Sequence, residues 1–354
     1  AIAIHANLDI EQALFTGAIW WVGDVIGVLF FTPLVLFLKT NSILEVPKKA
    51  WQIVLISLLT FAIISSLFAF SRDKYHTQRY QRFVESTQEF VQDFELLQSG
   101  IEHQLMAMNG LLQRTESVTR EDFYLFTEQL KRTDIPARAH AWLPLITRAK
   151  RTEFEQAARN SGFDDFKIKR ITEVGFTEAP QQDFYLPIFY TEPLTENQVA
   201  LGLDIATHPV VAELVDDSIK QNKIVVSPLM QLAQQQDKFT GVVFYYPVFN
   251  ANGFATSAYS NLRGLVQVVI ELDLLLESMY LRTKNQNFAY RLSYGLNNQI
   301  DNSNYDKQAL FNHKVAFNFF NQAATFEFSS LAKYEAKFVD WTSWLVIIAG
   351  CLLG

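Results

Sequence analysis

Two apolar runs near the N-terminus dominate the pattern of hydrophobic positions. Residues 13–38 carry one charge, Asp24, and residues 51–70 carry none. Each run reaches the roughly 20 residues that an α-helix needs to cross the apolar core of a bilayer. Buried helices of soluble proteins seldom run so long without a charge. The pattern therefore predicts two transmembrane helices, and a shorter apolar run at 341–354 predicts the start of a third.

The charges around these runs predict their orientation. Lys39, Lys48 and Lys49 lie between the two spans, and an excess of lysine in a short loop favours the cytoplasmic side. The basic residues that follow the second span point the other way, but large domains translocate largely regardless of such charges. We therefore expect a multi-pass protein of the cell (inner) membrane, with residues 72–340 outside the cytoplasm. For Asp24 we favour an interhelical hydrogen bond over a ligand or proton site.

A helical stripe follows the second span. Between residues 72 and 113, apolar positions recur every three or four residues, which is the spacing of one helix face. The predicted stalk helix continues directly from the second span and has a length on the order of 60 Å. The stripe fits either packing on the chain's own domain or a homodimer seam, and both can hold on different turns. Its members are Phe83, Thr87, Phe90, Phe94, Leu97, Ile101, Leu105, Met108 and Leu112.

Beyond the stalk, short strands and helices alternate in two successive sets. The first set, about residues 130–255, begins with ARAHAWLPLI and ends with GVVFYYPVF, both of which indicate strands. The second set, about residues 256–335, begins at RGLVQVVIELDLLLESMY, a strand followed by a helix. Asn-rich and Asp-rich turns separate its later strands. Two mixed units of this kind predict the α+β class.

Composition narrows the function classes. The 354 residues are 49% hydrophobic and carry a net charge of −7, which supports folded structure and leaves no basic block for nucleic acid. The only cysteine is Cys351, so residues 72–340 contain no thiol, as suits an oxidising compartment. The histidines have no metal-ligand spacing, and no phosphate-binding loop or nucleophile elbow is present. We therefore predict no catalytic residue, no metal site and no cofactor within this chain.

Three segments carry a family resemblance through their order and spacing. They are ARAHAWLPLITRAKRTEFEQAARNSGF, DFYLPIFYTEPLTENQVALGLDIATHP and VVSPLMQLAQQQDKFTGVVFYYPVFN. Over about residues 80–335 the chain resembles the CHASE domain, the extracytoplasmic sensory module of bacterial cyclases, histidine kinases and plant cytokinin receptors. Upstream, WWVGDVIGVLFFTPLVL resembles the closing helix of a MASE-type integral-membrane sensory domain. The CHASE resemblance implies a stalk helix and two PAS-like modules, with ligand bound in the membrane-distal one.

The resemblance also implies which strands surround the ligand. By position they are DFYLPIFY, LGLD, VSPL and GVVFYY. Alternation along a strand predicts that Asp183, Tyr185 and Phe189 lie on one side, where the other candidates close the same cavity. An apolar slot with a few convergent polar groups is the usual form of a small-molecule site. The candidate ligand-binding residues are Asp183, Tyr185, Phe189, Leu203, Asp204, Ser227, Leu229 and Phe244.

Each candidate also has a purely structural interpretation. The aromatic side chains fit a hydrophobic core, Asp183 fits a turn before a strand, and Asp204 fits a cap on the following helix. The pocket as a region is therefore a firmer prediction than any single side chain. An adenine-like ligand is one possibility among several.

Together these inferences predict the input half of a transmembrane receptor. A small molecule binds the distal module, and the change passes through the membrane to a cytoplasmic output. We expect that output to make or break down cyclic-di-GMP, with a histidine kinase as the second choice. The alternative is a ligand-free structural module that holds a dimer. The expected partners are a small molecule, the membrane and a second copy of the chain through the stalk helix, and nucleic acid is not among them.

Overall fold

The computed structural model describes most of the chain from residue 48 to residue 336. The described residues are 27–28, 32, 35 and 48–336, without 116, 132–134, 232–239, 251–257 and 284–285. Almost all of the predicted span at 13–38, Asp24 included, and the whole run at 341–354 lie outside them. The chain divides into two compact units, Ala1–Arg82 with Ala336–Gly354 and Phe83–Glu335. The second unit contains all the strands described below.

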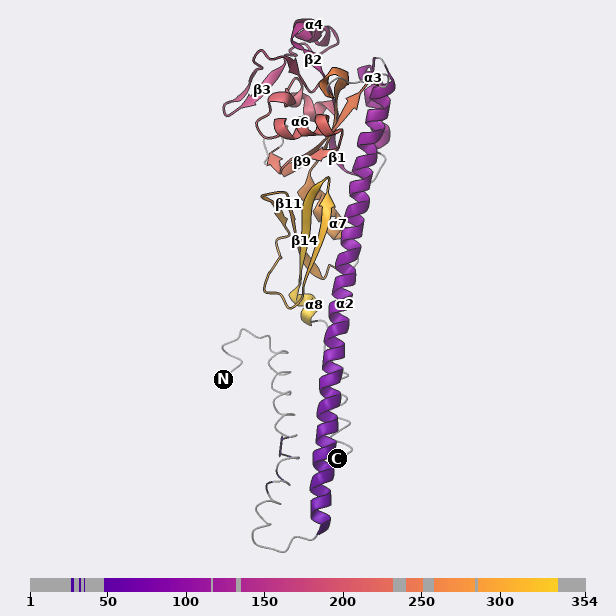
Figure 1. Ribbon diagram of the computed structural model, residues 1–354, viewed down its shortest axis with the longest axis vertical. Coiled ribbons are helices and arrows are strands. Elements are labelled where there is room, and N and C mark those ends of the chain that lie inside the picture. The colour runs from indigo at the N-terminus through magenta and orange to yellow at the C-terminus, as the bar shows by residue number, and fades with distance from the viewer. Residues whose placement is uncertain are drawn as a thin grey trace. The chain divides into compact units, whose positions relative to one another are not determined.

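One long helix, α2 (Lys48–Arg114), enters the second unit (Figure 1). Its 67 residues include both the predicted span at 51–70 and the predicted stalk, so the long helix expected from the sequence is present. Across the part of the chain that the structure describes, no helix combines the length and the apolar character needed to cross a membrane. The spans stay predictions.

The larger sheet is antiparallel and has six strands, in the order β6-β1-β10-β9-β7 with β8 also paired to β9. Its centre is formed by β1, β10 and β9, whose sequences are rich in Val, Leu and aromatic residues that favour strands. The bounds are β1 Ala137–Pro144, β6 Tyr190–Glu192, β7 Val225–Val226, β8 Met230–Gln231, β9 Thr240–Phe249 and β10 Leu262–Ile270.

Strand β10 corrects the expected boundary between the two modules. The sequence pattern placed this strand at the start of the second set, after a boundary near residue 255. In the structure β10 pairs with β1 on one side and β9 on the other, at the centre of the first sheet. Every residue from 264 to 270 is buried, so the strand needs a neighbour on each side and cover on both faces. The larger sheet therefore ends at Ile270 rather than near residue 255.

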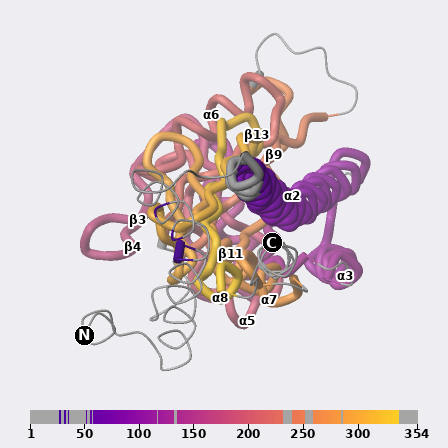
Figure 2. Tube along the Cα trace, turned by 90° about the horizontal axis from the view of Figure 1, so that it is seen from below, coloured from indigo at the N-terminus to yellow at the C-terminus, as the bar shows by residue number. Residues whose placement is uncertain are grey.

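Helices, turns and two small two-stranded sheets lie between β1 and β9. The two-stranded pairs are β2 with β5 and β3 with β4, and the latter projects away from the main sheet (Figures 1 and 2). The elements are β2 Ile146–Thr147, η2 Arg148–Lys150, α4 Arg151–Asn160, β3 Lys169–Thr172, β4 Gly175–Glu178, β5 Phe184–Tyr185, α5 Leu194–Asn197, η3 Gln198–Ala200, η4 Ile205–Thr207 and α6 Ala212–Gln221. A short helix, η5 Ala258–Asn261, precedes β10.

The second sheet has four antiparallel strands in the order β12-β11-β14-β13. Helix α7 Leu272–Arg282 leads into it from β10, and α8 Ala332–Ala336 follows its last strand. Its strands are β11 Phe288–Tyr294, β12 Asn298–Asp301, β13 Asn312–Phe319 and β14 Gln322–Ser330. Two successive antiparallel sheets with helices confirm the predicted α+β class. The predicted long helix is also present, as α2.

The apolar stripe of α2 packs on both sheets of its own chain. In the smaller sheet, the Phe90 ring stacks on Tyr290 at 5.4 Å between centroids, and the Phe94 ring meets Phe326 at 5.2 Å. Farther along, the helix buries its stripe beside the larger sheet, where Asn109 Nδ2 donates to the carbonyl of Pro247 at 2.7 Å. The stripe residues buried at 5% exposure or less are Phe83, Thr87, Phe90, Phe94, Ile101, Leu105, Met108 and Leu112. The first of the two interpretations of the stripe therefore holds.

A second helix, α3 (Arg120–Leu130), lies beside the upper end of α2 (Figure 1). It begins with a capping box, in which Thr119 Oγ1 accepts from the N–H of Asp122 and Asp122 Oδ2 accepts from the N–H of Thr119, both at 3.1 Å. Gln104 of α2 donates from Nε2 to the carbonyl of Leu130 at 3.4 Å. This bond fixes the end of α3 against α2.

Replacing Phe94 by alanine tests the packing of α2. Phe94 is 2% exposed and contacts Phe317, Phe319 and Phe326, so Phe94→Ala should lower the free energy of unfolding by about 3–5 kcal/mol. Leu96 lies two residues away and is 71% exposed, so Leu96→Ala should change it by less than about 0.5 kcal/mol. Denaturant unfolding of both variants measures the difference. Equal losses would contradict the packing described here.

His140 on β1 makes the junction between α2 and the larger sheet sensitive to pH. Its Nε2 donates to Gln104 Oε1 at 3.0 Å, and its side chain is buried. Burial, and to a smaller degree the charge of Lys131, lowers the pKa of His140 to about 4. An unfolded histidine has a pKa of about 6.5. Between these values the unfolded chain binds the additional proton, so stability falls as the pH falls through this window.

The expected loss at this site is on the order of 3 kcal/mol between pH 7 and pH 4. His140→Gln should remove that part of the pH dependence, whereas His103→Gln, on the exposed face of α2, should leave it unchanged. Burial raises the pKa of the neighbouring Glu192, which acts in the opposite direction in both proteins. The measurement is therefore the difference in unfolding free energy between wild type and variant across the pH range. A constant difference would exclude this role.

Candidate functional site

Tyr185 and Phe189 meet in one hydrophobic cluster beside α4. Tyr185 is fully buried, and its hydroxyl donates to the carbonyl of Pro180 at 3.1 Å and accepts from the N–H of Gln182 at 3.1 Å. The Phe189 ring lies 4.8 Å from the ring of Phe154. The structure therefore brings these two candidates together, in surroundings typical of a core.

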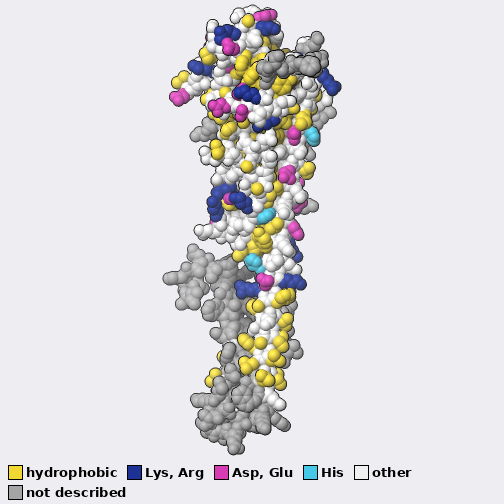
Figure 3. All heavy atoms as spheres, viewed as in Figure 1, with side chains coloured by type: hydrophobic (Ala, Val, Ile, Leu, Met, Phe, Trp, Pro, Cys, Tyr) yellow, Lys and Arg dark blue, Asp and Glu magenta, His cyan; other side chains and the backbone are white. Residues whose placement is uncertain are grey.

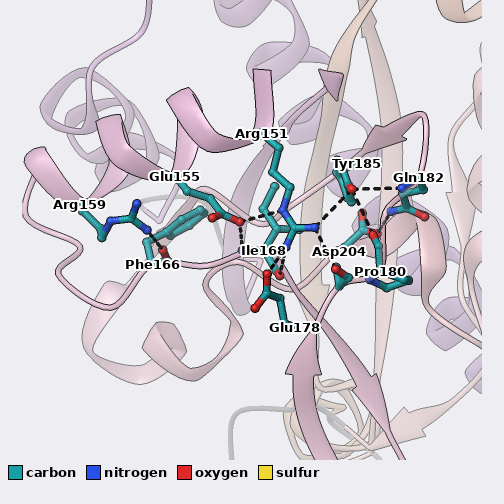
Figure 4. A network of polar contacts seen from close by, with 11 residues as sticks. Arg151, Glu155, Arg159, Phe166, Ile168, Glu178, Pro180, Gln182, Tyr185 and Asp204 are labelled. Carbon is teal, nitrogen blue, oxygen red and sulfur yellow. Dashed lines mark hydrogen bonds and ion pairs between the residues drawn. The ribbon is translucent and has the colours of Figure 1, made fainter. Parts of the chain in front are cut away.

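Arg151 connects this cluster to the hairpin β3–β4 (Figure 4). Its guanidinium pairs with Glu155 at 3.0 Å and Glu178 at 3.1 Å, and it donates to the carbonyls of Ile168 and Ala179. The guanidinium carbon also lies 5.0 Å from the centroid of the Tyr185 ring. One planar cation with five donors thus holds separate backbone segments in register.

Asp204 occupies the other end of the same network. Its side chain is fully buried and accepts from the N–H of Leu186 at 2.8 Å, Gln182 Nε2 at 2.6 Å and Thr207 Oγ1 at 2.9 Å. It also caps η4 through the N–H of Ala206. Gly202, two residues earlier, has φ +77°, and a Cβ there would lie 2.1 Å from a backbone carbonyl oxygen. The capping role that the sequence offered as the structural interpretation of Asp204 is therefore confirmed.

The remaining candidates lie elsewhere. The Asp183 side chain is 91% exposed and pairs with Arg148 at 2.9 Å. Leu203 belongs to the core of the larger sheet. Ser227 accepts from the N–H of Val243 at 3.0 Å, and the N–H of Leu229 donates to Asn298 of the smaller sheet. Phe244 is buried against Phe320, with ring centroids 4.7 Å apart. The structure does not gather all the candidates around one cavity, and ligand binding by each stays a prediction.

The pairing register of the larger sheet identifies a different row of side chains, all polar except that of Ala141. Thr191, Ala141, Gln267 and Tyr245 are successive cross-strand neighbours on β6, β1, β10 and β9. Ala141 and Tyr245 belong to the hydrophobic core that α6 and the loops close over this face. Burial raises the pKa of the Tyr245 hydroxyl. We call these four residues the polar row.

Gln267 is the distinctive member of the polar row. Its side chain is 4% exposed, and its Oε1 has no hydrogen-bond partner among the residues that the structure describes. Leaving a buried acceptor unpaired costs about 1–3 kcal/mol. An amide in this position can accept one N–H or O–H from a bound molecule, and Tyr245 lies on the neighbouring strand.

The sequence contains a signal for this row that the candidate list does not include. Gln267 is the single uncharged polar residue within the apolar run LVQVVI, and such a residue in a central strand faces either a partner or a ligand. In FYY, alternation requires Phe244 and Tyr245 to face opposite sides, but it does not say which residue faces the core of this sheet. Phe244 was the predicted pocket residue, and the register shows that Tyr245 takes the core-facing position.

The fold defines the class of protein as a two-sheet α+β module built along one long helix. A family model described as the CHASE domain matches residues 116–309. The chain belongs to the CHASE domain family, as its sequence motifs predicted.

Comparisons with solved structures give distant similarities. An extracellular ligand binding receptor from Desulfohalobium retbaense is 12% identical, with a TM-score of 0.44, and the match covers 70% of this chain and 40% of that one. The periplasmic sensory domain of the Campylobacter jejuni chemoreceptor Tlp1 is 13% identical, with a TM-score of 0.41, and the match covers 71% of this chain and 95% of that domain. No curated protein matches.

Two aspartates from the original candidates provide a matched test of the network. Asp204→Asn replaces an oxygen that accepts hydrogen bonds by an amino group that cannot, so it should lower the unfolding free energy by on the order of 3 kcal/mol. Asp183→Asn removes only an exposed ion pair and should cost less than about 1 kcal/mol. Denaturant unfolding of both variants provides the comparison. A small effect at Asp204 would show that its hydrogen bonds do not stabilise the fold.

Proposed function

We propose that this chain is the input half of a membrane-bound receptor and that the module built on its larger sheet binds a small molecule outside the cytoplasm. Membership of the CHASE family supports the sensory role. The observation that carries the ligand site is the unpartnered Oε1 of Gln267, which lies on the core-facing side of the sheet within the described part of the chain. A ligand that donates a hydrogen bond to this oxygen offsets the free-energy cost of burying it. Ligand binding would therefore explain why a polar side chain lies in this buried position.

The proposed ligand contacts follow from the polar row. Gln267 accepts a hydrogen bond from the ligand, Tyr245 supplies a hydroxyl, and Leu203 in the same core provides an apolar wall. Tyr185 and Phe189 form the adjoining cluster and stay candidates for contact with a larger ligand. Compounds with a flat apolar body and an N–H group fit these contacts, and an adenine-like compound is one of them.

The relay follows from the two faces of the same strands. On β10, Arg263 donates to the carbonyls of Gln113 and Thr115 at the end of α2. On β1, His140 bonds to Gln104 of α2. A ligand that binds one arrangement of these strands more tightly than another shifts the population of the attached helix. The output we propose is synthesis or breakdown of cyclic-di-GMP, with a histidine kinase as the alternative.

The membrane and dimer contacts are proposed from exposed apolar side chains on α2. Leu55, Leu59 and Phe70 are 69%, 62% and 69% exposed within the predicted span at 51–70, where apolar side chains gather on the helix surface (Figure 3). A bilayer covers such a surface, and the upstream segment is then the end of a MASE-type domain. Met106, which is 46% exposed on the stalk outside its buried stripe, is proposed to contact a second copy of the chain.

Thermal shift of the chain across a metabolite library tests the ligand site. A true ligand should raise the melting temperature of the wild type, and Tyr245→Phe should weaken its binding by roughly tenfold because one hydrogen bond is lost. Tyr246→Phe is the matched control, since Tyr246 lies on the opposite face of the same strand. Gln267→Leu should abolish the shift.

The alternative is a ligand-free module that holds the dimer. It predicts that no compound stabilises the wild type, and that Gln267→Leu raises the melting temperature by removing an unpaired polar atom without any other effect. It also predicts that the Tyr245→Phe and Tyr246→Phe variants bind any library hit equally well. Either the absence of a stabilising compound or equal binding by the two tyrosine variants would overturn the proposed ligand site.

A further inference from the structure

A cavity lies between α3 and the segment that leaves β6. Its volume is about 710 Å³. The residues that line it are Arg120, Glu121, Tyr124, Glu128, Lys131, Glu192, Pro193, Leu194 and Thr195. Thr191 belongs to the polar row, and successive residues of a strand point to opposite faces. Glu192 and this cavity therefore lie on the other side of the sheet from the proposed ligand site, and the two sites share no lining residue.

Glu192 gives the cavity its chemistry. Glu192 is 5% exposed, so the residue is largely shielded from water although it lines the cavity. Within the described residues its only hydrogen bond comes from the N–H of Leu194 to Oε2, at 3.2 Å, and no ion pair reaches it. Burial raises its pKa. A buried charge is stabilised when it pairs with an opposite charge. A cationic donor therefore binds such a carboxylate more strongly than a neutral donor does.

The two cations of the lining make their close contacts elsewhere, although the charges of Arg120 and Lys131 offset part of the rise in the pKa of Glu192. Lys131 pairs with Glu128 at the far end of α3. The guanidinium carbon of Arg120 lies 5.4 Å from the centroid of the Phe163 ring. The lining holds two basic and three acidic side chains, which leaves one negative charge without an opposite charge. The cavity therefore favours a positive ligand over an anion.

The other side chains suit the body of such a ligand. The Tyr124 side chain is 44% exposed in the lining and offers an aromatic ring to a cation. Pro193 and Leu194 add apolar surface beside the carboxylate. We propose that this cavity binds a small organic ammonium ion, whose N–H group donates to Glu192 and whose body lies against Tyr124 and Leu194. This site is independent of the ligand proposed for the polar row.

Three compounds of similar size distinguish the effect of ligand charge on binding from the effect of ligand shape. Benzylammonium, benzyl alcohol and benzoate share a ring and differ in the group that meets Glu192. Calorimetric titration of the whole chain should show that benzylammonium binds at least about tenfold more tightly than the other two, because only it pairs with the carboxylate. Equal binding of benzyl alcohol, or tighter binding of benzoate, would overturn the proposal. So would the absence of benzylammonium binding.

Matched variants assign the binding to this cavity. Glu192→Gln should weaken benzylammonium binding by about tenfold or more, whereas Glu196→Gln should leave it unchanged. Glu196 lies on the same short helix as Leu194 but pairs with Arg138 at 3.2 Å and does not line the cavity. If Glu192→Gln does not fold, as judged by circular dichroism, the surface variants decide. Tyr124→Ala should weaken benzylammonium binding several-fold and Tyr124→Phe should not, and equal affinities would overturn the site.

Gln267→Leu separates this proposal from the proposed sensory site. It should leave benzylammonium binding unchanged while it abolishes stabilisation by a ligand of the polar row. Loss of benzylammonium binding in Gln267→Leu would place the ammonium ion in the polar row instead. This result would overturn the proposed site at Glu192 and leave the proposed site at the polar row standing.

Discussion

Burial of a single face of α2 is the interaction on which the rest of the sensory unit depends. Isolated helices gain little stability from propensity alone, so packing of the apolar face has to supply it. Phe90 and Phe94 supply it at the smaller sheet, and Leu105 and Met108 lie buried farther along the helix. Because both sheets rest on the same rigid helix, neither can shift against it without repacking aromatic and aliphatic side chains. The signal path proposed above would run along α2 for this reason.

The two faces of the larger sheet make different contacts. One face closes a hydrophobic core that includes the polar row, and the other contacts α2 through His140 and carries Glu192. Arg151 and Asp204 hold the loops over the core by charge-assisted hydrogen bonds, which are the stronger kind. Only with these loops fixed does the core-facing side of the sheet have a defined shape. In the proposed function, ligand binding on one face and contact with the helix on the other would be coupled through the thickness of one strand layer.

Family membership and the polar contacts give different information about the proposed function. The CHASE match covers residues 116–309, which include the whole larger sheet and part of the smaller one. It indicates a sensory module but names no ligand. The contacts indicate which chemistry each face can recognise: an N–H or O–H donor at Gln267 and a cation at Glu192. Two recognition sites on opposite faces would allow two compounds to act on the same helix.

The sequence by itself determined the long helix, the apolar stripe along it, the α+β class and the family, because these depend on local periodicity and on the order of motifs. It also offered the cap at Asp204 as the structural interpretation of that candidate, and this cap is a contact within a few residues. Only the tertiary structure decided that β10 joins the larger sheet and that Tyr245, rather than Phe244, faces its core. Alternation shows that neighbouring side chains of a strand point to opposite faces. Which of the two faces becomes the core depends on strands that are distant in the sequence. For the same reason the sequence could not show that the candidate residues lie apart in the structure. Gln267 and Glu192 could be recognised only from the pairing of strands across the sheet.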